Sequence, residues 1–232
     1  MYGNFEGGGI LDNSLDCIVT SPPYNKSFFC KQKYSNQTWK GFGIDYLTYD
    51  DNMPLEDYES WMVELINLCL LKLKPNGSFF FNHKPIRHNN KVYFPLEFIL
   101  KSDARVYQEI IWDRRSSPNI RNDVLVPCTE RIYWLTKGKP KVYRNHLERD
   151  YYGEVWNIHP LKNDKHPAPF PPQLPLNCIL LGTKEGDTVF DPFKGIGTTG
   201  VQAVSNNRNF IGIEKDETYF SMASENIKNV NT

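Results

Sequence analysis

The sequence predicts an α/β fold in which a mostly parallel central sheet is covered by helices on both faces. Short apolar runs rich in β-branched and aromatic residues alternate along the chain with stretches of helical periodicity. This alternation is typical of strand–helix–strand units, whose strands are buried on both sides. A chain of 232 residues with 40% hydrophobic residues is long enough for one domain with a sizeable core. We therefore expect a single domain over residues 1–232.

Six apolar runs are predicted as strands. They are residues 17–20, 78–81, 106–112, 131–135, 188–190 and 210–213. In sheets of this kind ligands bind beyond the carboxyl ends of the strands. The residues that directly follow each run are therefore the candidate functional residues.

Four segments are predicted as helices. The clearest spans residues 55–72, where apolar side chains recur at steps of three and four, and Pro75-Asn76-Gly77 is expected to stop it. The later helices are predicted over residues 174–181, 198–205 and 217–229.

Composition excludes several classes of protein. The chain has 23% charged residues, and no apolar run reaches the ~18 residues that a membrane span needs. The start, MYGNFEGGG, lacks a basic stretch followed by an apolar one, so no secretory leader is expected. Five scattered cysteines without a CxxC pair argue against a disulfide framework or a structural metal. We expect a cytoplasmic protein with no membrane partner and no metal site.

Two segments interrupt the alternation of strands and helices. Residues 25–51 are polar and rich in aromatics and glycine, which is typical of a functional or mobile loop. Residues 114–145 carry eight basic and two acidic side chains in a chain whose net charge is zero. This segment is either a solvated basic surface or a phosphate-binding face. Its candidate DNA-binding residues are Arg114, Arg115, Arg121, Lys137 and Lys139.

Residues 187–200 predict a strand, a glycine turn and the start of a helix. Gly195 and Gly197 allow a tight turn and a close approach of the backbone to a ligand. Thr198 opens the helix, where free amides favour acceptor atoms. Glu214 follows the next strand, where an acid can accept both hydroxyls of a ribose. The pattern predicts a site for a nucleoside-containing cofactor.

The same turn fits more than one interpretation. Gly195, Gly197 and Gly200 match GxGxxG with Glu214 beyond, which is the dinucleotide fingerprint, although a glycine-bearing turn can also be purely structural. Asp191 lies at the end of the strand, where it would repel a pyrophosphate and suit a cationic ligand. The turn therefore favours an adenosine-containing cofactor with positive charge over NAD.

Residues 20–24, TSPPY, follow the first predicted strand. Consecutive prolines fix the backbone and remove two amides, which leaves carbonyls pointing in set directions. Ser21 and the Pro22 carbonyl could accept the hydrogens of an exocyclic amino group, while Tyr24 stacks on a flipped base. The alternative is a proline-stiffened turn with a packed tyrosine.

Together the two motifs resemble those of the amino-methylating DNA methyltransferases that use S-adenosylmethionine. TSPPY resembles the catalytic motif, DPFKGIGTTG the cofactor turn, and residues 210–214 the ribose-binding strand. Their order resembles the β-type arrangement, and residues 165–171 resemble the segment that closes over the cofactor. The resemblance implies a Rossmann-like methyltransferase fold and a restriction–modification context. It requires that folding bring residues near 21 alongside those near 195.

The resemblance also implies roles for individual residues. The catalytic motif would be Ser21, Pro22, Pro23 and Tyr24. The cofactor site would be lined by Asp191, Pro192, Phe193, Gly195, Gly197, Thr198, Thr199 and Glu214, with His166 and Phe170 near it. Target recognition is expected within residues 114–164, and residues 25–51 are expected to order over DNA. The implied partners are double-stranded DNA and a cognate restriction endonuclease or companion methyltransferase, with oligomers allowed.

The start of the chain departs from the family pattern. The family usually has a complete strand ending in Gly-Asp before the catalytic strand, whereas only Met1 and Tyr2 precede Gly3-Asn4 here. We expect a truncated first edge strand or a looser hold on the adenine end of the cofactor.

The family implies direct in-line methyl transfer to an amino nitrogen, without a cysteine nucleophile. A serine as first residue of the motif resembles the cytosine-N4 enzymes, whereas adenine-N6 enzymes more often have Asp or Asn there. Cytosine N4 is the favoured target and adenine N6 the alternative. An NAD-dependent oxidoreductase, a catalytically silent DNA-binding module and an RNA or protein methyltransferase are the other classes to separate by experiment.

Overall fold

The computed structural model describes residues 9–25, 53–88, 90–115, 117, 122–161 and 171–231. Several predicted features lie outside these residues. They are Asn4, nearly all of the loop 25–51, Arg121, His166 and Phe170.

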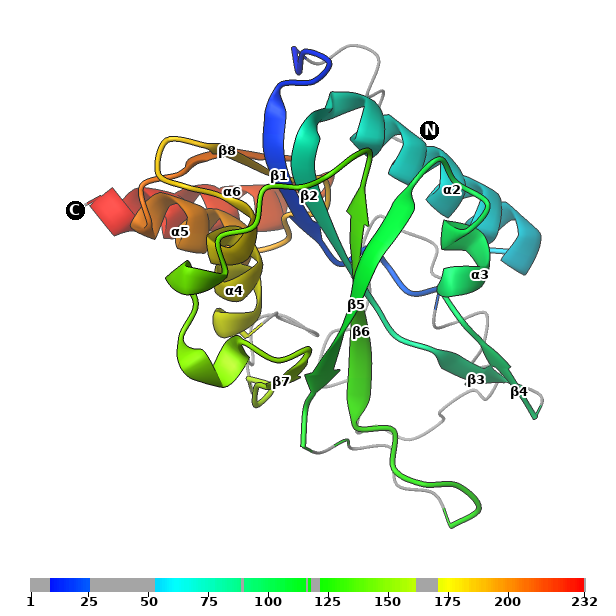
Figure 1. Cartoon of the computed structure of the whole chain (residues 1–232). Coiled ribbons are helices and arrows are strands. Elements are labelled where there is room, and N and C mark those ends of the chain that lie inside the picture. Colours follow the sequence, from blue (N-terminus) through cyan, green and yellow to red (C-terminus); the bar gives the residue numbers. More distant parts are fainter. Residues whose placement is uncertain are drawn as a thin grey trace.

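The centre of the molecule is a seven-stranded sheet with the order β7-β5-β6-β2-β1-β8-β9 (Figure 1). Four of its neighbouring pairs are parallel, and only β6 runs against its neighbours. The mostly parallel sheet predicted from the sequence is therefore confirmed. The strands are β1 (Leu15–Thr20), β2 (Leu73–His83), β5 (Arg105–Asp113), β6 (Thr129–Thr136), β7 (Val155–Asn157), β8 (Thr188–Asp191) and β9 (Asn209–Gly212).

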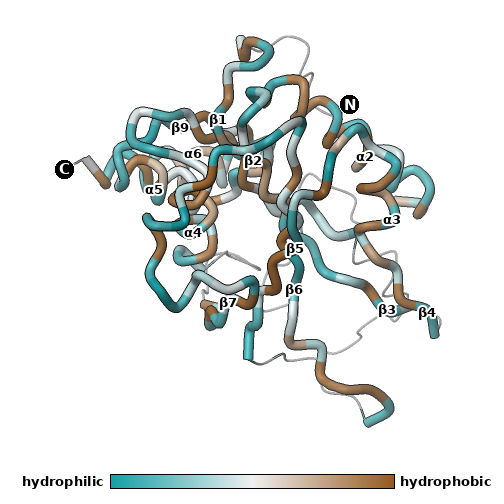
Figure 2. The backbone as a smooth tube through the Cα atoms, viewed as in Figure 1, coloured by the Kyte–Doolittle hydropathy of each residue, from teal (hydrophilic) through white to brown (hydrophobic). Residues whose placement is uncertain are grey.

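Helices cover both faces of the sheet because its inner strands are apolar on both sides. On β1, Ile18 packs in the cluster formed with α2 (Leu55–Lys72) and α3 (Leu96–Ile99). Its neighbours Cys17 and Val19 pack in the opposite cluster with α4 (Gln173–Gly182) and α5 (Thr198–Ser205). Figure 2 shows the apolar stretches concentrated toward the centre, where strands and helices meet.

The last helix, α6 (Glu217–Lys228), packs against α5. It begins where the Asp216 carboxylate accepts from the amides of Thr218 and Tyr219 at 2.9 and 3.0 Å. This is an N-cap, which satisfies amides that the first helical turn leaves unpaired.

All six predicted strands and all four predicted helices are present. The junction of α2 and β2 differs in detail, because the helix ends at Lys72 and β2 begins at Leu73, before Pro75-Asn76-Gly77. Gly77 is required there, since a Cβ would lie 2.9 Å from the Asp16 carbonyl oxygen on β1.

The sequence analysis missed the shortest elements. Three or four residues carry too little periodicity to separate a strand or helix from a loop. The missed elements are the hairpin β3 (Ile86–His88) and β4 (Lys91–Tyr93), α3, β7, and the 3₁₀ turns η3 (Arg144–His146), η4 (Arg149–Tyr151) and η5 (Asn229–Asn231).

The strand directions define one functional edge of the sheet. The carboxyl ends of the parallel strands β1, β2, β8 and β9 lie at this edge, together with the amino end of β6. Within the described ranges, no helix is long and apolar enough to cross a membrane.

Candidate functional site

The proline motif and the glycine turn meet at the functional edge. The Thr20 hydroxyl, at the end of β1, donates to Asp191 Oδ1 at 2.8 Å, although the two residues are 171 positions apart. The other oxygen of Asp191 accepts from the Thr199 hydroxyl at 2.7 Å, and Oδ1 also accepts from the Phe193 amide at 3.0 Å. Residues near 21 and residues near 195 therefore lie together, as the sequence analysis requires.

Asp191 is a buried carboxylate whose charge is sensitive to pH near neutrality. Its pKa is raised to about 6, mainly by burial and to a smaller extent by nearby Glu214. Hydrogen bonds from Thr199, Thr20 and the Phe193 amide favour the ionised form and oppose this shift. Both carboxylate oxygens are engaged within the protein, so Asp191 fixes the turn to β1 and supplies negative charge beside it.

The glycine turn is held in a tight conformation by Glu214. Gly195 and Gly197 have φ values of 51° and 88°, which favour glycine. The Gly195 amide donates to Glu214 Oε2 at 2.9 Å. Glu214 Oε1 accepts from the amides of Lys215 and Asp216 at 2.9 and 3.0 Å. The carboxylate is thereby fixed at the end of β9, next to the turn.

Tyr24 is packed into the site and is only 8% exposed. Its ring stacks on His83 with centroids 4.3 Å apart. The Tyr58 hydroxyl on α2 donates to the Pro23 carbonyl oxygen at 2.8 Å and lies 2.8 Å from His83 Nε2. Helix α2 and strand β2 thus hold the motif in place. Stacking of Tyr24 on a base stays a prediction.

A network of polar side chains lies under the motif. The Tyr24 hydroxyl donates to Glu130 Oε2 at 3.0 Å and lies 2.8 Å from Ser21 Oγ. Asn82 Nδ2 donates to the Tyr24 hydroxyl at 2.7 Å and to Glu130 Oε2 at 3.1 Å. Arg114 donates to Glu130 Oε1 at 2.8 Å, and the two side chains form an ion pair.

The sequence analysis did not identify Asn82, His83 or Glu130. Asn82 and His83 directly follow the run 78–81, so the rule of looking beyond each strand's carboxyl end would have found them. Glu130 lies at the start of β6, and the antiparallel direction of this strand brings its first residues to the same edge. The sequence pattern carried no signal for that direction.

The predicted basic residues are divided between the two ends of β6. Arg114 and Arg115 lie at the functional edge, where Arg115 is exposed and 3.5 Å from Asp113. Lys137 lies at the other end, where its ammonium donates to the Leu73 carbonyl and Asn13 Oδ1, both at 2.8 Å. A strand of eight residues spans roughly 25 Å. Lys137 and Lys139 therefore do not share a surface with Arg114 and Arg115.

The range 114–164, assigned to target recognition, also contains β6 and β7 of the central sheet. Its described parts outside these strands are 114–115, 117, 122–128, 137–154 and 158–161. Asn25 is linked to Met53 just before α2, because the Asn25 side chain bonds both the amide and the carbonyl of Met53 at 2.8 and 2.7 Å.

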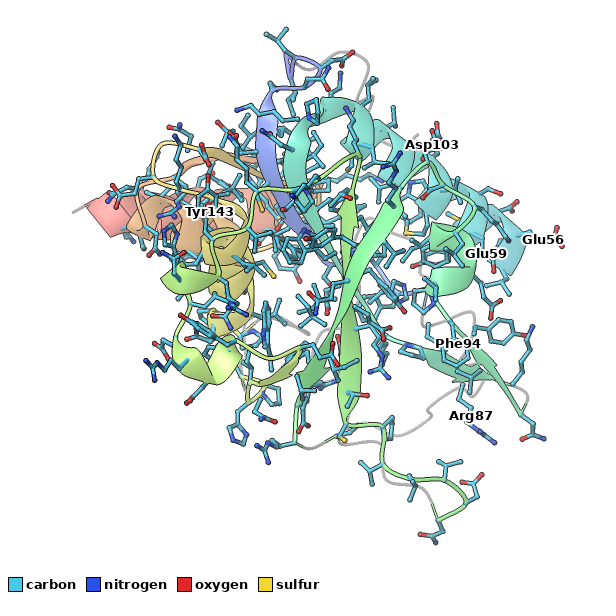
Figure 3. The ribbon with its side chains drawn as sticks, in the orientation of Figure 1. Glu56, Glu59, Arg87, Phe94, Asp103 and Tyr143 are labelled. Atoms are coloured by element: carbon cyan, nitrogen blue, oxygen red, sulfur yellow. The ribbon has the colours of Figure 1, made fainter. Side chains whose placement is uncertain are left out.

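A basic hairpin continues from β2 at the functional edge. Residues 84–94 include Lys84, Arg87 and Lys91 and no acidic residue. Arg87 and Lys91 are exposed. In Figure 3 Arg87 and Phe94 lie at the hairpin, on the side opposite Tyr143. A pocket between α2, α3 and this hairpin is lined in part by Tyr58 and His83.

Comparison with protein families shows which family the chain belongs to. The profile of a family described as DNA methylase, covering N6 and N4 methyltransferases, matches residues 15–225. The chain belongs to the N6/N4 DNA methylase family. The match includes the proline motif, the glycine turn and the strands between them.

Relatives of the N6/N4 DNA methylase family cover most of the chain. It is 29% identical to the Type II methyltransferase M.BglII of Bacillus subtilis over 249 residues, 92% of this chain and 64% of M.BglII. It is 28% identical to the Type II methyltransferase M2.LlaDCHI of Lactococcus lactis subsp. cremoris, over 94% of this chain and 84% of that protein. The chain thus spans slightly less than two thirds of M.BglII.

Solved structures confirm the Rossmann-like methyltransferase fold. PvuII DNA methyltransferase, described as cytosine-N4-specific, superposes with a TM-score of 0.74 at 19% identity, over 96% of this chain and 86% of that one. The complex of M1.HpyAVI with S-adenosylmethionine gives a TM-score of 0.58 at 25% identity, over 91% and 88% of the two chains.

The cofactor of the N6/N4 DNA methylase family is S-adenosylmethionine, and the donor set of the glycine turn fits it. A carboxylate offers about four lone-pair positions, and Glu214 uses three on backbone amides. One position remains for a ribose hydroxyl. The negative charge of Asp191 lies beside the turn, where a sulfonium cation is favoured and a pyrophosphate is not.

Proposed function

We propose that the chain is a site-specific DNA methyltransferase of a restriction–modification system that methylates the exocyclic N4 of cytosine. The observation that carries the proposal is the hydrogen bond between Thr20 and Asp191, because it joins the amino-group motif to the cofactor turn. Serine at position 21 supports cytosine N4 over adenine N6, which is the alternative target.

S-adenosylmethionine supplies an electrophilic methyl group on its sulfonium sulfur. The amino nitrogen of the base attacks this carbon as the N–C bond forms and the C–S bond breaks. The electron pair of the broken bond stays on sulfur, and the nitrogen loses one proton to solvent. The protein contributes position: Ser21 Oγ and the Pro22 carbonyl accept the amino hydrogens and hold the nitrogen in line with the methyl group.

A base inside a duplex cannot reach a site at the edge of a sheet, so the target would be flipped out of the helix. Tyr24 would stack on it. Basic residues at the functional edge, Arg115, Arg87 and Lys91, would contact the phosphates around the flipped nucleotide. We extend the proposal to a cytoplasmic protein that acts beside a cognate endonuclease or a companion methyltransferase.

The test is transfer of labelled methyl groups from S-adenosylmethionine to mixed-sequence duplex DNA, followed by digestion and identification of the nucleosides. The expected product is N4-methyldeoxycytidine. N6-methyldeoxyadenosine would overturn the choice of base and keep the reaction class. Label in RNA or protein with none in DNA would overturn the proposal. So would a binding experiment in which NADH quenches the protein's fluorescence and S-adenosylmethionine does not bind.

A further inference from the structure

We propose that Glu130 is a positioning residue that forces Ser21 to act only as a hydrogen-bond acceptor toward the target amino group. The inference rests on the proposed function and concerns the same site. It follows from the direction of the hydrogen bonds that link Glu130, Tyr24 and Ser21.

The first step is the bond between Tyr24 and Glu130. Glu130 is 5% exposed and paired with Arg114, whose guanidinium compensates its buried charge. A carboxylate can only accept hydrogen bonds. The Tyr24 hydroxyl, 3.0 Å from Glu130 Oε2, must therefore donate its single hydrogen to Glu130.

The second step is the bond between Ser21 and Tyr24, whose oxygens are 2.8 Å apart. Because the only hydrogen of the Tyr24 hydroxyl is committed to Glu130, Ser21 must be the donor in this pair. The serine hydrogen then points into the protein. One lone pair of Ser21 Oγ faces the Asn82 amide at 3.4 Å, and the other stays available to accept from an amino group.

Asn82 has a fixed orientation in the same network. Its Nδ2 faces Glu130 Oε2 at 3.1 Å, and this bond fixes the orientation of the amide, since only the NH₂ end can donate to a carboxylate. The opposite atom, Oδ1, is buried and has no hydrogen-bond partner among the described residues, although Asn82 is only 2% exposed. A buried acceptor without a partner is costly, and the bonds of Nδ2 to Tyr24 and Glu130 hold the amide in this orientation.

Replacement of the carboxylate by an amide reverses this chain. In Glu130→Gln the amide can donate to the Tyr24 oxygen, so the tyrosine hydrogen becomes free to point at Ser21. Ser21 can then turn its own hydrogen toward the substrate amino group, where two donors oppose each other. We expect kcat for methyl transfer to fall at least tenfold, while the Kd for S-adenosylmethionine stays close to the parent value.

The experiment is a double-mutant cycle on kcat with Ser21→Ala, because a structural role of Glu130 would act equally in both backgrounds. We expect Glu130→Gln to lose its effect once Ser21 is absent. Tyr24→Phe, which removes the linking hydroxyl, should abolish the same effect and serves as a second variant. The matched control is Glu109→Gln on β5, which makes the same change beside Arg131 outside the site; it should leave kcat unchanged.

The outcomes separate the two levels of the proposal. An active parent enzyme with unchanged kcat in Glu130→Gln, or with equal losses in both backgrounds, overturns the role of Glu130 alone. A parent enzyme that transfers no methyl group to DNA overturns the proposed function and this inference with it.

Discussion

Thr20 on β1 and Asp191 on β8 share a hydrogen bond of 2.8 Å at the point where the proline motif and the glycine turn meet. The bond satisfies one oxygen of a carboxylate that is 2% exposed. It also fixes the distance between the residue before Ser21 and the strand that leads into the cofactor turn.

Thr20→Val should therefore destabilise the fold. The substitution keeps the shape and leaves Asp191 Oδ1 with the Phe193 amide alone, which costs ~1–3 kcal/mol for a buried charged acceptor. Denaturant unfolding measures the loss. Thr136→Val is the matched control, because Thr136 is fully buried on β6 and its hydroxyl has no partner among the described residues. An equal loss in both variants would contradict the assigned role of the Thr20 bond.

Binding of S-adenosylmethionine should weaken as pH falls through about 6, the pKa to which burial raises Asp191. Above that pH the carboxylate is ionised and attracts the sulfonium; below it the carboxyl is neutral. Calorimetry from pH 5 to pH 8 measures the effect. Asp191→Asn should bind more weakly at pH 8 and show a flatter profile, and an identical profile in the variant would argue against this site.

The raised pKa of Asp191 has the opposite effect on the folding stability of the cofactor-free protein, which falls rather than rises with pH. Because the folded pKa lies above the ordinary value of 3.8, Asp191 contributes stability at low pH that is lost as pH rises through about 6. The difference in unfolding free energy between the parent and Asp191→Asn should change across this window. A constant difference would contradict the raised pKa.

Two substitutions of Tyr24 should separate the contribution of its ring to methyl transfer from that of its hydroxyl. Tyr24→Ala removes a stacking surface worth roughly 1–3 kcal/mol per base and should lose most methyl transfer. Tyr24→Phe keeps the ring and should retain more activity. Both should keep cofactor binding, measured by calorimetry. Turnover of Tyr24→Ala equal to that of the parent would remove Tyr24 from the base pocket.

The DNA-binding surface can be located by equal charge changes at opposite ends of the sheet. Arg87→Gln with Lys91→Gln removes two charges from the hairpin at the functional edge. The slope of log affinity for DNA against log salt concentration should then become shallower by ~0.9 per lost phosphate contact. Lys141→Gln with Lys184→Gln removes two exposed charges near the amino ends of the strands. An equal loss of DNA affinity in the two double variants would point to non-specific attraction between the protein and DNA.

The sequence was sufficient to predict the main elements and both motifs. The runs at 17–20 and 188–190 are apolar on both sides, which is typical of inner parallel strands, and the residues after each run lie at the candidate site. Their adjacency followed from the family resemblance and is confirmed by the contact between Thr20 and Asp191. The hairpin β3–β4 and strand β7 were missed because three residues give no measurable period.

What the sequence determined by itself is local: which segments become strands and helices, where the chain turns, and which side chains follow each strand. Tertiary structure decided the direction of β6, which depends on pairing with β2 and β5 and leaves no trace in its own apolar pattern. That direction carries Glu130 to Tyr24 and Lys137 to the far end of the sheet. A strand has the same alternation read either way, so only its partners determine which end reaches the site.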